Sequence, residues 1–152
     1  MLKLNDIAVA YDDMYILQNV TATFEKGKFY GILGPNGSGK TTLLKVMSNV
    51  LKPNEGKVLL NNQPIEQYKA KQLAKIMSVL PQLNASTFSN TVRETVSIGR
   101  YPHQSGLFST WSKEDEKAVQ LAMEQTGTLQ FEHMPVTFLS GGEQQRVFIA
   151  QA

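Results

Sequence analysis

Residues 34–42 read Gly34-Pro35-Asn36-Gly37-Ser38-Gly39-Lys40-Thr41-Thr42. This run matches the phosphate-loop pattern G-x-x-x-x-G-K-[ST], in which glycines let backbone N–H groups turn inward around phosphate oxygens. An apolar run at residues 29–33 precedes it and predicts a strand, and residues 41–50 predict a helix. A chance match to the pattern in 152 residues has a probability of roughly one in two hundred. This disfavours the alternative of a glycine-rich turn without a ligand.

The loop supplies the groups that a bound triphosphate needs. Lys40 provides a point charge for the β- and γ-phosphates, and the Thr41 hydroxyl is placed to ligate Mg²⁺. The helix that starts here directs the positive end of its dipole at the same anion. We therefore predict a nucleoside triphosphate site formed by the whole run, which consists of Gly34, Pro35, Asn36, Gly37, Ser38, Gly39, Lys40, Thr41 and Thr42.

The composition is that of one ordinary globular domain. Hydrophobic residues make up 41% of the chain and charged residues 18%, and the net charge of +2 is too small to argue for nucleic acid or an anionic membrane surface. The absence of cysteine excludes disulfides and thiol nucleophiles, and the two histidines, His103 and His133, lie too far apart to indicate a metal site. No signal peptide and no apolar run approaching the ~20 residues of a membrane span is present. We expect a soluble intracellular protein that meets membranes only through a partner.

The pattern along the chain predicts an α/β fold. Short apolar runs predict strands at residues 2–9, 20–25, 57–60 and 76–80. Helical patterns follow at residues 91–98 and 112–126, the second beginning with a capping box at Ser112. Residues 83–90 are polar and are expected to form a mobile loop. We divide the chain into a β subdomain with the phosphate loop at 1–82, a helical insert at 83–138 and a last segment at 139–152.

A second chemical element opens the last segment and reads Leu139-Ser140-Gly141-Gly142-Glu143-Gln144-Gln145-Arg146. Ser140 and Glu143 have capping-box spacing, so Ser140 is predicted to be the N-cap of a helix that continues through Ala152. Gly141 and Gly142 remove side chains from the first turn, where an oxyanion can then approach free N–H groups. Alone, S-G-G-E is equally consistent with a plain helix start. After a phosphate loop it predicts a second anion site.

Together the two motifs resemble the ATP-binding subunit of an ABC transporter, and the resemblance covers essentially the whole chain. In that family residues 34–42 correspond to Walker A and residues 139–146 to the signature. The signature of one subunit closes on the γ-phosphate held by Walker A of the other, in a head-to-tail homodimer. The implied fold is an α/β P-loop NTPase core with an N-terminal antiparallel β subdomain and a helical insert, and the implied cofactors are ATP and Mg²⁺.

The resemblance also implies roles for residues outside the phosphate loop. Tyr11 corresponds to the aromatic residue that stacks on adenine; taken alone, it would equally suit a half-buried strand position. Gln82 corresponds to the Q-loop glutamine that senses Mg²⁺ and the attacking water; taken alone, it would suit a surface position. The implied catalytic residues are Lys40 and Gln82, with Ser140 and Gly142 acting in trans, and the implied metal-binding residues are Thr41 and Gln82.

Residues 91–96 and the run Gly99-Arg100-Tyr101-Pro102-His103 are similar to a segment of importers for ferric siderophores, haem and cobalamin. In such importers this region faces the membrane subunits, although a G-R-x-P loop would also serve to pack the helical insert. The resemblance implies import of an iron(III)-siderophore or a related iron chelate, with transmembrane permease subunits as partners and no nucleic acid. It places the chain peripherally at the cytoplasmic face of the cell membrane. One departure concerns the substrate subclass, because such importers often carry arginine ahead of the proline where this chain has Met134-Pro135.

The chain ends at Ala152 within an apolar helical pattern, and no acidic residue follows Glu143. In the resembled family the next element is the Walker B strand with a catalytic Asp-Glu pair. We therefore expect an incomplete core sheet with an exposed apolar edge, and a chain that binds nucleotide weakly at best and does not turn over. Two alternatives stay open. A soluble ABC-type ATPase acting on nucleic acid or ribosomes carries the same two motifs, and a nucleotide-binding module without turnover would carry them too.

Overall fold

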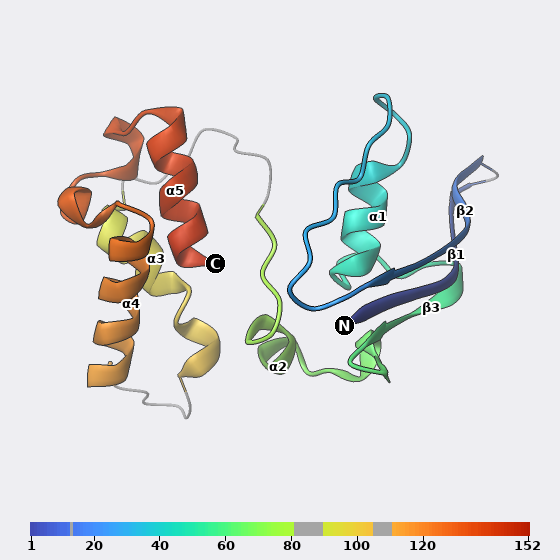
Figure 1. The fold of residues 1–152 in the computed structure, drawn as a ribbon, viewed down its shortest axis with the longest axis horizontal. Coiled ribbons are helices and arrows are strands. Elements are labelled where there is room, and N and C mark those ends of the chain that lie inside the picture. Colours follow the sequence, from blue (N-terminus) through green and yellow to red (C-terminus); the bar gives the residue numbers. More distant parts are fainter. Residues whose placement is uncertain (13, 81–89, 105–110) are drawn as a thin grey trace. The chain divides into compact units, whose positions relative to one another are not determined.

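The computed structural model of the chain describes residues 1–12, 14–80, 90–104 and 111–152. These residues divide into two units, Met1–Ala70 and Lys71–Ala152. Figure 1 shows a β-sheet with one helix in the first unit and a group of helices in the second. The first unit contains the phosphate loop, and the second contains the predicted signature.

The first unit is built on a four-stranded antiparallel sheet. Its strands are β1 (Leu2–Tyr11), β2 (Met14–Phe24), β3 (Glu55–Leu60) and β4 (Gln63–Pro64), in the spatial order β2-β1-β3-β4. Apolar side chains of the two central strands form its core, with Leu4, Ile7 and Val9 of β1 and Val58 of β3 buried. The strands predicted at residues 2–9, 20–25 and 57–60 are confirmed, with bounds set by the strand pairing.

A bulge in β1 explains an irregular burial pattern along that strand. The register of β1 shifts after Leu4 against β2 and after Asn5 against β3, and Asp6 has a positive φ of 49°. On β3, Gly56 has φ +87°, and a Cβ on it would meet the carbonyl oxygens of Asn5 and Asp6 at 2.4 Å. A side chain at that position would push the two strands apart, so the bulge requires glycine there.

A two-residue turn joins β3 to β4. Asn61 and Asn62 have φ values of 51° and 64°, which is the pattern of a type I′ turn and matches the twist of a hairpin. The chain then enters a 3₁₀ turn, η1 (Ile65–Gln67), in which Ile65 is buried.

Helix α1 (Lys40–Met47) follows the phosphate loop as predicted, but it ends at Met47 instead of residue 50. The Ser48 hydroxyl donates to the carbonyl oxygens of Leu44 and Lys45 at 2.8 and 3.2 Å, and Asn49 takes a left-handed φ of 60°. The Ser48 bonds satisfy carbonyl groups of the last helical turn, and the left-handed Asn49 directs the chain out of the helix. The apolar pattern beyond Met47 therefore does not extend the helix.

The strands predicted at residues 29–33 and 76–80 are wrong, because neither run lies in a strand. Within the described ranges the sheet pairs only β1 to β4, so neither run has a neighbour to bond with. Phe29 and Leu33 are fully exposed, and Val79 is 55% exposed. An apolar run identifies a segment suited to a buried strand, but the strand forms only where a neighbour supplies the ladder of hydrogen bonds.

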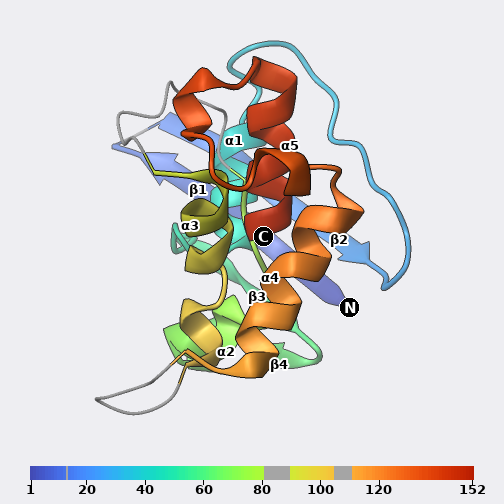
Figure 2. The same cartoon turned by 90° about the vertical axis from the view of Figure 1, so that its left-hand side faces the viewer.

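The second unit is helical. Its helices are α2 (Ala70–Ala74), α3 (Val92–Ile98), α4 (Lys113–Gln125) and α5 (Gly141–Gln151), with 3₁₀ turns η2 (Tyr101–His103), η3 (Leu129–Phe131) and η4 (Val136–Phe138). Figure 2 shows α3, α4 and α5 beside one another. Their shared core consists of Val92, Val96, Val119, Met123, Val136, Leu139 and Val147. The helices predicted at residues 91–98 and 112–126 are confirmed.

Helices α3, α4 and α5 each begin with a capping box. The pairs are Thr91 with Glu94, Ser112 with Asp115, and Ser140 with Glu143. In each pair the third residue of the helix reaches back to the backbone N–H of the cap residue, which satisfies a donor that the helix leaves open. The caps predicted at Ser112 and Ser140 are therefore confirmed.

Helix α4 ends with a Schellman motif. Gly127 has a left-handed φ of 64°, its N–H donates to the carbonyl of Glu124 at 3.1 Å, and the Thr128 N–H donates to the carbonyl of Met123 at 2.8 Å. Both bonds satisfy carbonyls of the last turn. The chain reverses here and brings η3 back against the shared core.

Candidate functional site

The phosphate loop is shaped by two glycines in the left-handed region. Gly37 and Gly39 have φ values of +82° and +83°, which side chains rarely adopt. At Gly39 space is also limiting, because a Cβ would meet the Leu17 Cδ2 at 2.9 Å and the Ile16 carbonyl oxygen at 3.1 Å. The loop therefore lies directly on β2. Glycine is required at position 39 because of its left-handed φ and because β2 leaves no room for a Cβ.

Lys40 folds back over the loop. Its ammonium donates to the carbonyl oxygens of Gly34 at 2.8 Å and Pro35 at 2.7 Å. Within the loop itself, the Ser38 N–H donates to the Pro35 carbonyl at 3.3 Å. The positive charge of Lys40 is thus held at the loop by two neutral acceptors, and an anion bound in the loop would meet it there.

The N-terminus of α1 is open to an anion. No side chain caps it and no acidic residue lies in its first turn. Within the described residues, the first N–H to bond back at this end is that of Leu43, which donates to the Gly39 carbonyl at 2.8 Å. The N–H groups of residues 40–42 and the positive end of the helix dipole therefore face a ligand position with no competing acceptor.

A magnesium ion at this loop fits only together with phosphate. Thr41, in the first turn of α1, is exposed, so its hydroxyl is accessible to a cation. The described residues contain no group of three or more histidine, cysteine, aspartate or glutamate side chains that would hold a metal. A cation held by Thr41 would therefore take most of its oxygen ligands from the nucleotide and water, as Mg²⁺ does in phosphate sites.

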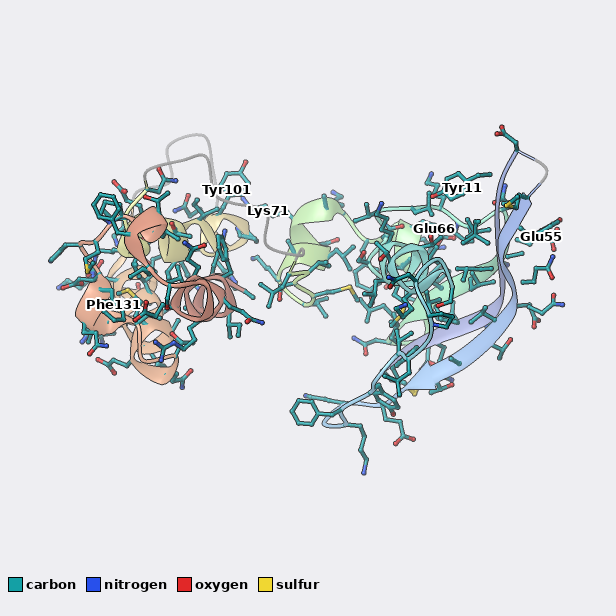
Figure 3. The ribbon with its side chains drawn as sticks, turned by 90° about the horizontal axis from the view of Figure 1, so that it is seen from above. Tyr11, Glu55, Glu66, Lys71, Tyr101 and Phe131 are labelled. Atoms are coloured by element: carbon teal, nitrogen blue, oxygen red, sulfur yellow. The ribbon has the colours of Figure 1, made fainter. Side chains whose placement is uncertain are left out.

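Tyr11 lies at the end of β1, where it pairs with Met14 across the β1–β2 hairpin. It is half exposed, and Met14 and Tyr15 beside it are 69% and 49% exposed. The hairpin end therefore presents aromatic and apolar surface in the same unit as the phosphate loop (Figure 3). This accessibility is what stacking on a base requires.

The first turn of α5 is equally open. Ser140, Gly141 and Gly142 are exposed, and a Cβ on either glycine would meet nothing within 4 Å. Within the described residues, the first N–H to donate to a backbone carbonyl at this end is that of Gln144, to the Ser140 carbonyl at 2.9 Å, and the Glu143 N–H belongs to the capping box. The N–H groups of the two glycines are therefore accessible to an oxyanion, as their sequence predicts.

Glu143 is tied to Ser140 by two bonds. Its Oε2 accepts from the Ser140 hydroxyl at 2.6 Å and from the Ser140 N–H at 2.8 Å. These two bonds, the hydroxyl first, hold the pKa of the Glu143 carboxyl below its ordinary value. Glu143 is thus ionised at neutral pH beside the open first turn of α5.

The run at residues 99–103 has packing partners inside the helical unit. The Arg100 Nε donates to the Asp115 carboxylate at 2.8 Å, and the Asp115 side chain is only 8% exposed. This bond and those from Ser112 lower the pKa of Asp115. A Cβ on Gly99 would meet the Gln151 carbonyl oxygen at 2.0 Å, so α3 and α5 touch there. These contacts support the packing interpretation for Gly99 and Arg100.

Tyr101, in contrast, points outward and is 71% exposed. The Lys71 ammonium lies 5.7 Å from the centre of the Tyr101 ring and also donates to the Gln104 carbonyl. Figure 3 labels the two side chains, which lie near each other. Sequence reasoning missed this contact and the Arg100–Asp115 pair. The capping-box position of Asp115 indicated its backbone partner, but nothing in the spacing indicated Arg100.

The structure places the predicted site residues in separate groups. The phosphate loop and Tyr11 lie in the first unit, and Ser140 and Gly142 lie in the second. Gln82 and most of the predicted loop at residues 83–90 lie outside the described residues. Each group can therefore be assessed by its own geometry.

The chain thus has two open helix N-termini, that of α1 after the phosphate loop and that of α5 at Ser140, Gly141 and Gly142. The sequence profile of the family described as "ABC transporter" matches residues 17–152. The chain belongs to the ABC transporter family. The motifs at residues 34–42 and 139–146 both lie within the matched range.

Known proteins similar to this ABC chain include two from Bacillus subtilis (strain 168). One is an uncharacterized ABC transporter ATP-binding protein, YvrA, with 50% identity over 151 residues, covering 99% of this chain and 34% of YvrA. The other is the iron(3+)-hydroxamate import ATP-binding protein FhuC, with 40% identity over 151 residues, covering 99% of this chain and 56% of FhuC. The ABC chain thus spans about a third of one relative and about half of the other.

Solved ABC structures share the fold. A metal-chelate type ABC transporter in an inward-facing conformation matches with a TM-score of 0.81 and 26% identity, covering 99% of this chain and 54% of that one. The dimeric ATP-binding cassette MJ0796, in a post-hydrolysis state bound to ADP and Pi, matches with a TM-score of 0.77 and 29% identity, covering 99% and 68%. The predicted fold class, an α/β ABC ATPase cassette, is confirmed.

No helix in the described parts of this ABC chain has the length and apolar character that a membrane span requires.

Proposed function

We propose that this ABC chain is the ATP-binding part of a subunit that, as a complete protein, hydrolyses ATP to drive an importer. The observation that carries the proposal is the phosphate loop, with two left-handed glycines, an ammonium held over the loop and an uncapped helix N-terminus behind it. Each of these features favours binding of an anion, and together they suit the triphosphate of a nucleotide.

The nucleotide is assigned to residues 34–42, with Tyr11 stacking on the base. Lys40 would exchange its two carbonyl partners for phosphate oxygens, because charge-assisted bonds to an anion are stronger than bonds to neutral carbonyls. Mg²⁺, which completes the site when bound with the nucleotide, would be held by Thr41 and Gln82. The exposed Thr41 hydroxyl supports this assignment, and Gln82 is assigned on its motif alone.

The signature is assigned to the nucleotide of a second subunit, in a head-to-tail homodimer. Ser140 and Gly142 would act there in trans by donating hydrogen bonds to the γ-phosphate. The open first turn of α5 supports this assignment, as does the dimeric state of the MJ0796 cassette. In this arrangement the catalytic groups of the chain are Lys40, Gln82, Ser140 and Gly142.

The cargo is proposed to be an iron(III)-siderophore or a related iron chelate. The name of FhuC and its 40% identity support an iron chelate, and the run at residues 99–103 agrees with this. Transmembrane permease subunits would be the partners, which places the subunit peripherally at the cytoplasmic face of the membrane. The exposed residues of that run, Tyr101 and His103, are available to a partner.

We propose hydrolysis for the complete protein and not for this chain alone. Phosphoryl transfer requires a group that positions water and carboxylates that support the metal. Neither the run at residues 34–42 nor the first turn of α1 contains an acidic residue. We expect the chain alone to bind nucleotide weakly and to release no phosphate.

The nucleotide assignment is tested by calorimetric titration with Mg-ATP, with Lys40→Ala as the control. Two proteins are titrated: this chain, and the complete protein that contains it, here called the native subunit. The native subunit is expected to bind Mg-ATP, and the variant to bind at least about tenfold more weakly, because it loses a charge-assisted bond of roughly 1.5–3 kcal/mol. Equal binding by the wild type and the variant, or no binding by either length of the wild type, contradicts the assignment.

A second experiment tests the importer assignment. The native subunit, purified from gently solubilised cells, is expected to bring down a multi-span membrane protein. Recovery with ribosomes or nucleic acid in its place would favour a soluble ABC-type ATPase.

A further inference from the structure

Helix α5 carries the Glu143 carboxylate beside its first turn, where the proposed function places a phosphate. The Glu143 carboxylate accepts both the hydroxyl and the N–H of Ser140, at 2.6 and 2.8 Å. A serine hydroxyl has one proton to donate. While that proton points at Glu143, Ser140 has no hydroxyl donor for a phosphate, which is itself only an acceptor.

Of the other two capping boxes, the one on α3 also uses a glutamate and has the same bonds. There the Glu94 Oε2 accepts the N–H and the hydroxyl of Thr91 at 2.7 and 2.9 Å, and its pKa is lowered by the same kind of bonds. The capping geometry of Glu143 is therefore not special in itself. What distinguishes the two boxes is what surrounds them.

The N–H groups in the first turn of α3 already have hydrogen-bond acceptors, whereas those of Gly141 and Gly142 in the first turn of α5 face open space. The N–H groups of Val92 and Arg93 donate to the carbonyls of Met134 and Glu132, each at 3.0 Å, and Val92 is fully buried. At α5 the corresponding residues are Gly141 and Gly142, which are exposed and have open space around them. A ligand anion can therefore bind the first-turn N–H groups of α5, beside Glu143, but not those of α3, which already have acceptors.

We propose that Glu143 is a positioning residue of the signature, whose carboxylate orients the Ser140 hydroxyl and opposes phosphate binding until the hydroxyl turns from the carboxylate to the phosphate. This inference rests on the proposed function, because it takes the signature to meet a nucleotide. The Glu143 carboxylate and the phosphate compete for the proton of the Ser140 hydroxyl. Their negative charges also repel each other, and solvent screens this repulsion only in part. Glu143 thereby raises the nucleotide concentration at which the two subunits close.

The test uses Glu143→Gln in the native subunit without membrane partners. The glutamine amide oxygen can accept from the same two donors, so the cap is kept and only the charge is lost. Glu94→Gln makes the same change in the capping box of α3, where the first-turn N–H groups already have acceptors, and serves as the matched control. Thermal unfolding checks that both variants keep the wild-type melting temperature within a few degrees.

The measured quantity is the Mg-ATP concentration that gives half-maximal phosphate release. Removing one charge near the phosphate is expected to lower it about three- to tenfold in Glu143→Gln and not at all in Glu94→Gln. The difference between Glu143→Gln and the wild type is expected to shrink when salt is raised from about 0.05 to about 0.5 M, since screening weakens charge repulsion but not a purely structural effect.

The outcomes separate the inference from the proposed function. If phosphate release by the wild type is abolished in Lys40→Ala but Glu143→Gln needs as much Mg-ATP as the wild type, or the gain does not depend on salt, the inference fails alone. If release is the same in Lys40→Ala as in the wild type, the nucleotide assignment fails and the inference falls with it.

Discussion

Gly39 shows at the scale of one residue how the loop and the sheet constrain each other. Its left-handed φ of +83° already disfavours a side chain, and Leu17 and Ile16 of β2 leave no room for a Cβ. Gly37 has nearly the same φ of +82°, but nothing lies within 4 Å of its Cβ position. The two glycines therefore separate backbone strain from steric exclusion.

We predict that Gly39→Ala destabilises the protein more than Gly37→Ala does. Alanine at Gly37 adds only left-handed strain, about 1 kcal/mol, whereas at Gly39 the displacement of β2 side chains adds about 1–3 kcal/mol more. Urea unfolding of both variants, with the slope of the transition compared with the wild type, measures the difference. Equal midpoints would mean that the contact between the loop and β2 does not constrain the fold.

At the scale of elements, Asp115 joins two helices. Its carboxylate caps α4 through Ser112 and accepts a bond from Arg100, which follows α3. The Asp115 side chain is only 8% exposed. Removing the Arg100 guanidinium would therefore leave the charge of the Asp115 carboxylate poorly compensated. The α3–α4 junction therefore depends on the ionised form of Asp115.

We predict that Asp115→Asn is less stable than the wild type at pH 7 and that the deficit shrinks in acid. The pKa of Asp115 in the folded protein lies below its usual 3.8, chiefly because of the Arg100 bond. The ionised carboxylate therefore stabilises the fold above that value, and the contribution is lost as the pH falls through the lower, folded-state pKa. Melting temperatures at pH 7, 5 and 3 measure the difference.

The same measurement in Arg100→Ala supplies the control. There Asp115→Asn is expected to cost less at pH 7, because the largest cause of the pKa shift is gone. A deficit that persists undiminished at pH 3 would show that Asp115 acts through its shape and not its charge.

The elements also show which parts of the structure the sequence could predict. The caps at Ser112 and Ser140 need only residues three apart, and the turn at Asn61 and Asn62 needs only two residues that tolerate left-handed φ, so both were predictable from local pattern. The runs at residues 29–33 and 76–80 have the composition of strands, but pairing depends on segments distant in sequence. Local pattern therefore predicted strands that the described structure does not form.

The site divides in the same way. The backbone shape of the phosphate loop and of the first turn of α5 was predictable because each depends on consecutive residues with known backbone needs. The contact of Gly39 with Leu17, the Arg100–Asp115 pair and the Lys71–Tyr101 contact join residues that local spacing does not relate. These depend on tertiary packing and were not predictable.

At the scale of the whole molecule, the two units have separate cores. The sheet buries residues such as Leu4 and Ile7, and the helical unit buries a cluster that includes Met123 and Val119. Each unit therefore has apolar burial of its own to support its structure.

We predict that Met123→Ala loosens the helical unit selectively. Loss of a fully buried methionine is expected to cost about 2–5 kcal/mol, and the amides of α3, α4 and α5 should exchange with solvent faster while those of β1 and β3 keep their protection. Hydrogen exchange followed by mass spectrometry of peptides measures this. Leu4→Ala in β1 is the mirror control, and uniform loss of protection in both variants would show a single cooperative unit.

The bonds that Lys40 makes to Gly34 and Pro35 have a consequence for how ATP is received. They fix the lysine chain and the loop carbonyls in one arrangement while the protein folds, so the ordering entropy of that long side chain is lost before any ligand arrives. Binding of phosphate is then an exchange of partners by an ammonium that is already in place. The loop is in this sense preorganised, and its affinity reflects the difference between carbonyl and phosphate as acceptors, with little further loss of freedom.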